Sequence, residues 1–463
     1  MRKSGKNTSW SDGRAVDGRR DSEVEEFEGL HAYMLRPFII QKGRRIHFDL
    51  PADWNLLTFA ALEDLPQTAD VRDLAVRALK HPVGSLPLRE RVSPSDTVAI
   101  LIEDLTRASP KGIILRVVLK ELEKARIPDR HIVVVIALGT HRGLTSTELE
   151  SVFGADLLAR YLFINHDCHA PDLVPAGRLP TGRVVKINRA VQEATFRIGI
   201  GSIFPHPMNG FGGGGKILFP GVADFDSIRE HHFQYTFHEG TGLGKMEGNL
   251  FYEQVSRIAT EARLDFIVNT VLDQKDQAHD LVCGHPVHAH LAGIQISKGI
   301  ISQEFPGKSD LTVITSFPYS EGPQIVKPLA PAAMVTREGG AIILCADLDG
   351  DLPVPFVESF ERFHREHGHD LLGAVLDHFQ KNRLIMEGGA IDFNMALAMT
   401  LATQHRFKTV LVSENISREQ GEKMGFAYAQ DLEEAFALGS IVCPQPKVHI
   451  IPSGGVILPV VGS

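Results

Sequence analysis

Cysteine is scarce in this chain of 463 residues, and no two cysteines stand at metal-binding or redox spacing. Only Cys168, Cys283, Cys345 and Cys443 occur, without a C-x-x-C pair. The sequence therefore favours neither a zinc site nor a disulfide framework. Thiols scattered in this way are typical of a reducing compartment, so we predict a cytoplasmic protein.

An excess of basic residues is also absent. Lysine and arginine together number 48, against 57 aspartates and glutamates, which gives a net charge of −9. This balance argues against nucleic acid or a membrane surface as a partner, because both need a basic excess. No run of about 18 apolar residues occurs, so we predict no membrane span. Residues 1–28 are polar, carry charges of both signs and lack the apolar core of a signal peptide, which predicts a disordered tail.

Short β-branched runs alternate with helical patterns along the rest of the chain. A helix is predicted at 111–126, where apolar residues recur at helical spacing between two such runs. This alternation is typical of βαβ units. With the length of the chain, it predicts an α/β fold of two α/β domains with mostly parallel sheets and an active site in the interdomain cleft. The runs lie at 97–104, 131–140, 196–204, 264–271, 310–316, 340–346 and 407–413.

A polar stretch at 273–280 precedes a new series of strands and marks the predicted domain boundary. We place the N-terminal domain at 29–285 and the C-terminal domain at 286–463. The final apolar segment, 448–461, continues the strand pattern, and the sequence leaves open which domain it joins.

Residues with chemical functions follow the predicted strands. In open α/β sheets, ligands bind beyond the carboxyl ends of the strands. Each residue alone has a structural explanation, since Asp104 could cap a helix and a single histidine is more often structural than catalytic. Together they indicate a site, which comprises Asp104, Leu105, Thr106, Arg107, His141 and His206 in the first domain and Gln324 and Lys327 in the second.

Four consecutive glycines, Gly212–Gly215, directly precede Lys216. Such a run is costly in a folded chain unless a ligand approaches the backbone or the chain needs positive φ. The pattern matches part of a phosphate-binding P-loop, but Ile217 replaces the Ser/Thr and Pro220 interrupts the helix that a P-loop needs. A flexible loop with an incidental lysine is a second explanation. We favour a phosphate-bearing or covalently held ligand at Lys216.

Two adjacent histidines, His231 and His232, lie on a predicted helix downstream, where at most one of them can face the cleft. With His232 included, the order and spacing of these motifs resemble the nickel-pincer lactate racemase family. The resemblance covers most of the chain after about residue 40 and rests on Asp104-x-Thr106-Arg107, Gly139-Thr140-His141-Arg142, His206, the Gly-Gly-x-Lys that ends at Lys216, His232 and Gln324-x-x-Lys327.

The resemblance implies a racemase or epimerase that inverts C2 of a 2-hydroxy acid by reversible hydride transfer. It implies a nickel pyridinium-3,5-bisthiocarboxylate mononucleotide, attached covalently to Lys216, with His232 as the protein's nickel ligand. The N-terminal domain would be the cofactor-binding and catalytic domain, and the C-terminal domain would bind the substrate. The implied partners are the small-molecule substrate and the proteins that make the cofactor. The implied roles are acid and base for His141 and His206, cofactor lining for Asp104, Leu105, Thr106 and Arg107, and substrate binding for Gln324, Lys327 and Arg107.

The chemistry of these residues agrees with those roles. A cofactor that takes hydride avoids a carbanion at C2, where the C–H bond is very weakly acidic. An imidazole with a pKa near 6.5 suits transfer of the hydroxyl proton, and two imidazoles provide one base for each hand of the substrate. Lys327 can pair with the substrate carboxylate, and Arg107 can add a bidentate clamp. Nickel accepts soft sulfur donors together with one imidazole.

Two positions depart from the family pattern. Phe379 stands where the family has a tryptophan, and Pro323 stands where it has a tyrosine, both expected at the substrate. The substrate therefore stays open among lactate, larger aliphatic or aromatic acids, dicarboxylic acids and sugar acids. Two other functions also stay open: a nucleotide-dependent enzyme that uses the glycine loop as a phosphate cradle, and a non-catalytic binding protein of the same fold.

Overall fold

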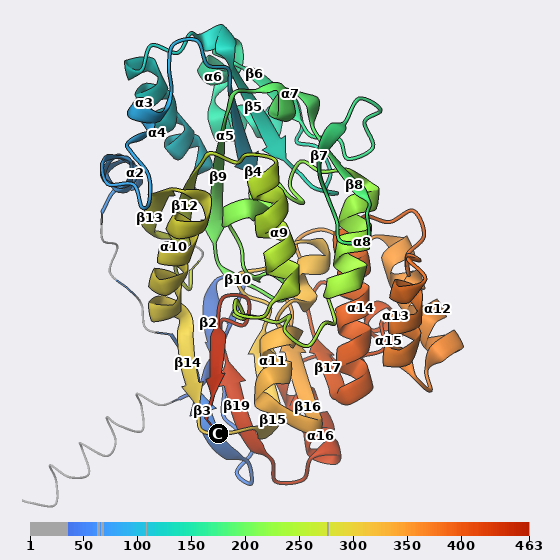
Figure 1. Cartoon of the computed structure of the whole chain (residues 1–463). Helices are drawn as coiled ribbons and strands as arrows, with labels where there is room; N and C mark the ends of the chain where they lie inside the picture. The colour runs from blue at the N-terminus through green and yellow to red at the C-terminus, as the bar shows by residue number, and fades with distance from the viewer. Residues whose placement is uncertain (1–35, 63–64, 66–68, 108, 276, 463) are drawn as a thin grey trace, which may run out of the picture.

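The computed structural model describes residues 36–462 except 63–64, 66–68, 108 and 276. The predicted tail at residues 1–28 lies outside the described residues. Two six-stranded sheets organise the described chain, each with helices packed on its faces (Figure 1). The predicted α/β fold with two domains is confirmed.

The first sheet has the strand order β13-β12-β9-β4-β5-β6 and is parallel except for its edge strand β13. Its central strands are buried along almost their whole length and are mostly apolar, because both faces of the sheet are covered, as is usual for parallel sheets. Helices α2 (Val71–Lys80), α4 (Lys111–Lys124) and α10 (Pro286–Ile301) pack against it. Its strands are β4 (Val98–Glu103), β5 (Ile132–Ala137), β6 (Leu162–Asn165), β9 (Phe196–Ile203), β12 (Phe266–Leu272) and β13 (Ala278–Gly284).

The second sheet has the order β18-β17-β16-β15-β19-β3 and is parallel throughout. Helices α11 (Leu329–Val335), α14 (Ile391–Arg406) and α16 (Leu432–Val442) pack against it. Its strands are β3 (Asn55–Phe59), β15 (Ser309–Thr315), β16 (Thr336–Cys345), β17 (Lys408–Val412), β18 (Ala427–Ala429) and β19 (Lys447–Ile451).

Strand pairing departs from the predicted division near the N-terminus. β3 lies inside the range predicted for the first domain, yet it forms an edge of the second sheet beside β19 (Figure 1). Trp54, just before β3, donates a hydrogen bond to Ser440 Oγ at 3.0 Å and packs on Phe436, both on α16. A local pattern does not reveal which distant strand a segment will pair with, so this placement could not be predicted.

The final apolar segment belongs with the C-terminal part of the chain. β19 lies in the second sheet, and β20 (Leu458–Val461) pairs in parallel with β14 (Ser302–Phe305). The question that the sequence left open is thereby answered.

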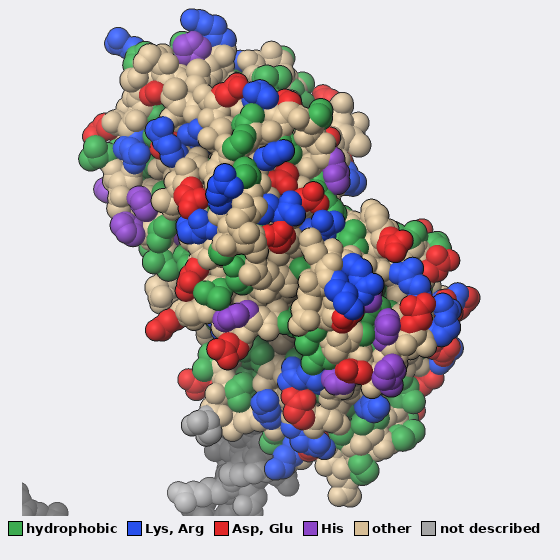
Figure 2. Space-filling view, turned by 45° about the vertical axis from the view of Figure 1, so that its right-hand side comes forward, with side chains coloured by type: hydrophobic (Ala, Val, Ile, Leu, Met, Phe, Trp, Pro, Cys, Tyr) green, Lys and Arg blue, Asp and Glu red, His purple; other side chains and the backbone are tan. Residues whose placement is uncertain are grey.

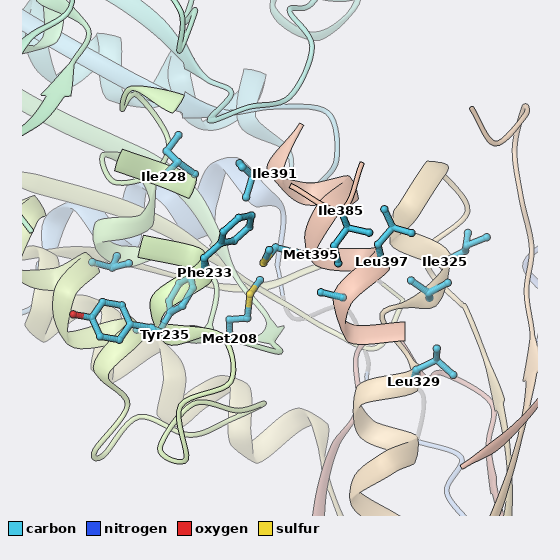
Figure 3. Close-up of a cluster of buried hydrophobic side chains, with 14 of the residues drawn as sticks. Met208, Ile228, Phe233, Tyr235, Ile325, Leu329, Ile385, Ile391, Met395 and Leu397 are labelled. Carbon is cyan, nitrogen blue, oxygen red and sulfur yellow. The ribbon is translucent and has the colours of Figure 1, made fainter. Parts of the chain in front are cut away.

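An apolar contact joins the two domains beside the cleft. Helix α8 (Phe225–Tyr235) supplies Phe233, the turn between β10 (Pro205–His206) and β11 (Gly210–Phe211) supplies Met208, and α14 supplies Ile391 and Met395 (Figure 3). These side chains belong to one buried cluster, so the two domains share a continuous core at this point.

The surface and the helices agree with the composition. Lysines and arginines are interspersed with aspartates and glutamates over the face shown in Figure 2. Among the described residues, no helix is both long and apolar enough to cross a membrane. The four cysteines are free and buried.

Candidate active site

A cavity of about 200 Å³ lies between the domains, beyond the carboxyl ends of β4, β5 and β9. The second domain closes it with the 3₁₀ helix η3 (Gly322–Val326) and the start of α14. Of the ten predicted site residues only Leu105 does not line the cavity, because it packs against the core of the first domain instead. The nine that line it are Asp104, Thr106, Arg107, His141, His206, Lys216, His232, Gln324 and Lys327.

Asp104 and His141 form a hydrogen-bonded pair at neighbouring strand ends. Asp104 Oδ1 accepts hydrogen bonds from the backbone N–H (3.0 Å) and the hydroxyl (2.6 Å) of Thr106. Its Oδ2 lies 2.5 Å from His141 Nδ1. Burial disfavours the charged forms of both side chains. Their mutual hydrogen bond and opposite charges outweigh this effect, so the pKa of Asp104 is lowered and the pKa of His141 is raised. The pair therefore favours a protonated His141 whose Nε2 is free for a ligand.

His206 has the opposite electrostatic environment. Its Nδ1 accepts the backbone N–H groups of Met208 at 3.2 Å and Asn209 at 3.1 Å. Burial, followed by the positive charges of Lys216 and Lys327, holds the pKa of His206 well below its ordinary value. The ring is therefore neutral, and the two amide donors place its proton on Nε2.

The glycine loop is packed tightly on all sides. Gly213 and Gly214 have positive φ, at 82° and 58°, and Gly214 N–H donates to Asn269 Oδ1 at 2.9 Å. A Cβ on any of the four glycines would overlap a neighbouring side chain. The neighbours, in order along the loop, are Phe204, Asn269, His290 and Ala259. The absence of side chains in this loop thus has a packing cause in the protein itself.

The turn after the glycines is not a P-loop helix. Gly214–Ile217 form the four-residue 3₁₀ helix η2, which ends without continuing into an α-helix. The dipole of a long helix, which stabilises phosphate in a P-loop, is therefore missing here.

Lys216 and His232 both lie in the cavity, and the pKa of each is lowered. Burial, then the charge of Arg107, lowers the pKa of Lys216 to about 7. Burial, then the charge of Lys216, lowers the pKa of His232 to about 3. His232 Nδ1–H donates to the carbonyl of Ile228 at 2.8 Å, which leaves the Nε2 lone pair for a metal.

The adjacent His231 is fully buried and does not line the cavity, as the helical spacing predicted for one of the two. It bonds instead to the carbonyl of Phe251 at 3.2 Å. Within the part of the chain that the structure describes, no group of three or more His, Cys, Asp or Glu could hold a metal ion. A metal at His232 would therefore need most of its ligands from a bound cofactor.

The second domain contributes Gln324 from η3 and Lys327, which directly follows η3. Burial, then the charges of Arg107 and Lys216, holds the pKa of Lys327 well below its ordinary value. Gln324 Oε1 is buried without a hydrogen-bond partner among the described residues. A bound anion that carries a hydroxyl would stabilise both groups. Its negative charge would favour the protonated form of Lys327, and its hydroxyl would donate a hydrogen bond to Gln324 Oε1.

The sequence missed the contribution of α14. Asp392 and Met395 line the cavity, and Asp392 Oδ2 lies 3.8 Å from His141 Nε2. The only signal in the sequence was an acidic residue at the start of a helix, which is common at helix N-termini.

Of the two positions expected at the substrate, Pro323 lines the cavity, but the expectation for Phe379 was wrong. Phe379, on α13 (Leu371–Gln380), stacks on Phe233 with ring centroids 4.1 Å apart and belongs to the core.

Comparison with known proteins shows that this chain is similar to lactate racemases. Residues 42–244 match the family model "Lactate racemase N-terminal domain". The lactate racemase of Thermoanaerobacterium thermosaccharolyticum is 29% identical over 394 residues, which are 82% of this chain and 89% of that protein. The lactate racemase of Lactiplantibacillus plantarum is 30% identical over 276 residues, covering 58% of this chain and 64% of that protein.

Solved structures agree with the sequence matches. The lactate racemase apoprotein from Thermoanaerobacterium thermosaccharolyticum superposes with a TM-score of 0.81 at 25% identity, covering 92% of this chain and 100% of that one. A Thermotoga maritima protein at 18% identity, with a TM-score of 0.63, shares the fold.

Proposed function

We propose that this chain, which belongs to the lactate racemase family, inverts C2 of a 2-hydroxy acid by reversible hydride transfer to a nickel-pincer nucleotide held by Lys216. Named lactate racemases among its relatives make it an isomerase with a small-molecule substrate. The observation that carries the proposal is the convergence of two histidines, two lysines and His232 on one cavity.

The donor set fits the nickel pyridinium-3,5-bisthiocarboxylate mononucleotide. Because the pKa of Lys216 is lowered to about 7, a large fraction of its side chain is neutral amine near neutral pH, which is the form that a thioamide bond requires. His232 offers a neutral imidazole whose Nε2 can bind nickel, with Nδ1 fixed by the Ile228 carbonyl. When bound, this group would supply the acceptor for the hydride of C2. The proposal also includes a cytoplasmic location and, as partners, the proteins that make this cofactor.

The two histidines move the hydroxyl proton. His141 Nε2 holds a proton well, because Asp104 stabilises the imidazolium through Nδ1. His206 is the weaker base and the stronger acid of the two. For its Nε2 to take the substrate proton, the ring proton of His206 must lie on Nδ1. His206 therefore releases the amide hydrogen bonds of Met208 and Asn209 during turnover.

Substrate binding falls to the second domain and Arg107. Lys327 binds the carboxylate, and Gln324 Oε1 accepts from a hydroxyl. Arg107, stacked over the Phe204 ring at 4.2 Å, adds positive charge from the first domain. Apolar side chains of α14 and η3 complete the wall, and they exclude water from the reacting carbon.

The test is made on protein produced beside cofactor-maturation proteins. We expect interconversion of the two hands of a 2-hydroxy acid, bound nickel, and a mass excess on the peptide that contains Lys216. Lys216→Arg should lose both the mass excess and the activity, since a guanidinium keeps the charge without offering an ordinary amine. Active, nickel-free protein with an unmodified Lys216 would contradict the proposal. Tight nucleotide binding without nickel would favour the phosphate-cradle alternative.

A further inference from the structure

Asp392 differs from the other carboxylates of the cavity in its hydrogen bonding. Glu103 accepts from two serine hydroxyls, and Asp104 accepts from Thr106 and His141. Asp392 Oδ1 is buried, and the described residues provide it with no hydrogen-bond donor. A buried carboxylate oxygen without a donor is costly, so a ligand that supplies one gains binding energy at this position.

The position of Asp392 is fixed by a contact between the domains. The backbone N–H of Ile391, its neighbour at the start of α14, donates to Thr140 Oγ1 at 3.1 Å. The helix dipole favours an acidic side chain in this first turn, which explains the charge but leaves Oδ1 without a donor. The side chain of Asp392 lines the cavity and is 21% exposed, so a ligand can contact the carboxylate, which must turn about its Cβ–Cγ bond to present the buried Oδ1.

Asp392 is close to both groups that hold the substrate in the proposed function. Its Oδ2 lies 3.8 Å from Nε2 of His141, which exchanges a proton with the C2 hydroxyl. It is also near enough to Lys327, which binds the carboxylate, for the two charges to interact. In the proposed function Asp392 therefore lies near C1 and C2 of the substrate, and a substituent on the next carbon is the first one that neither His141 nor Lys327 binds.

We propose that Asp392 determines specificity by accepting a hydrogen bond from a second substrate hydroxyl, on the carbon next to C2. The preferred substrates are then 2,3-dihydroxy acids, including longer sugar acids, rather than lactate. This inference rests on the proposed function, which places C2 and the carboxylate.

Other substituents fit this position less well. A second carboxylate would be repelled by Asp392, and a methyl group would leave Oδ1 unpaired. An ammonium group would pair with Asp392 but would share the cavity with the cations Arg107 and Lys327. A hydroxyl donates a hydrogen bond without adding charge.

The test compares lactate and glycerate, which differ by one hydroxyl at C3, on cofactor-loaded protein. We expect kcat/KM for glycerate to exceed that for lactate by about tenfold or more, because a site built for a hydroxyl rejects the analogue that lacks it. Asp392→Ala should bring this ratio close to one. The ratio cancels any effect of the substitution on His141, because both substrates use that histidine.

Two further variants complete the experiment. Asp392→Asn keeps the size and one acceptor oxygen, so its ratio should lie between those of the wild type and Asp392→Ala. If Asp392→Ala does not fold, the fall in the ratio for Asp392→Asn decides the question. Asp377→Ala removes an exposed carboxylate on α13 that does not line the cavity, so it should keep the wild-type ratio. Isothermal titration of both acids should show the same order of affinity.

The outcomes separate the two proposals. A wild-type preference for lactate, or a ratio that Asp392→Ala leaves unchanged, would overturn the role of Asp392 alone. Cofactor-loaded protein that interconverts neither these acids nor longer 2-hydroxy acids would overturn the proposed function and this inference with it.

Discussion

At the scale of single residues, His141 lies between two carboxylates that belong to different domains. Asp104 holds Nδ1 at 2.5 Å, and Asp392 lies 3.8 Å from Nε2. Burial opposes the imidazolium, but these two neighbours raise the pKa of His141 above its ordinary value. Burial and the positive charges around it hold the pKa of His206 well below its ordinary value. The two rings therefore start in different protonation states, which an acid/base pair requires.

Removing the charge of Asp104 tests this arrangement. In Asp104→Asn the imidazolium of His141 loses its partner, so the pKa of His141 should fall. The limb of the pH–rate profile that belongs to His141 should then move to lower pH, and kcat/KM should fall by about 100-fold or more. The profile is measured on cofactor-loaded protein with a 2-hydroxy acid.

The matched control is Glu148→Gln, which removes a carboxylate paired with the exposed Arg142 at 2.6 Å. This control should keep the wild-type profile. An Asp104→Asn enzyme whose limb stayed at the wild-type pH would show that Asp104 does not act through His141.

Most of these residues could be identified from the sequence because they follow predicted strands. The sequence did not reveal which of their side chains form hydrogen bonds with each other. Asp104 was expected to line the cofactor, and its bond to His141 depends on β4 and β5 being neighbours in the sheet. Asp392 could not be predicted, because nothing local to a helix start says which loop of another domain it will face.

At the scale of elements, the four glycines of the loop are required because the neighbouring side chains leave no room for a Cβ atom. The sequence favoured a ligand as the reason for the four glycines. The structure instead places Phe204, Asn269, His290 and Ala259 where their Cβ atoms would lie. The loop therefore holds Lys216 in place by being wedged between β9, β12, α9 (Leu250–Glu261) and α10.

Gly214→Ala should destabilise the protein for two separable reasons. The positive φ of 58° costs about 1–2 kcal/mol for a residue with a Cβ, and overlap with the His290 ring adds about 1–3 kcal/mol. Gly350→Ala is the control for φ alone, because its φ is 76° and no atom lies within 4 Å of the added Cβ. Denaturant titration should show a clearly larger loss for Gly214→Ala than for Gly350→Ala.

A double variant isolates the overlap. Combining Gly214→Ala with His290→Ala should cost less than the sum of the two single changes, by about 1 kcal/mol or more, because the methyl group can occupy the space of the ring. Strictly additive losses would show that the His290 ring does not press on Gly214.

At the scale of the whole molecule, the sequence patterns predicted two parallel sheets but not every strand that belongs to each. Strand runs such as β4, β5 and the second half of β16 were recognisable because buried parallel strands are nearly continuous apolar runs. β3 was not assigned correctly, since its partner β19 lies at the other end of the chain. Long-range pairing of this kind ties the N-terminal segment to the second domain.

The last prediction concerns the contact that aligns the two domains at the cavity. Helix α14 has no side-chain cap of its own, and Thr140 of the first domain accepts the N–H of Ile391 in its first turn. A capping hydrogen bond is worth about 1 kcal/mol, which corresponds to about a fivefold effect on a rate constant. Thr140→Val keeps the shape but removes the acceptor, so kcat/KM should fall by about fivefold or more. Hydrogen exchange in the first turn of α14 should rise at the same time.

Thr140→Ser keeps the hydroxyl and should stay close to the wild type in both measurements. The direction of the effect follows from the geometry, because loss of this contact lets Asp392 move away from His141 and opens the wall that Met395 forms. If Thr140→Val matched Thr140→Ser in both kinetics and exchange, the alignment of the domains would have to depend on the apolar contacts of Met208, Phe233 and Met395 alone (Figure 3).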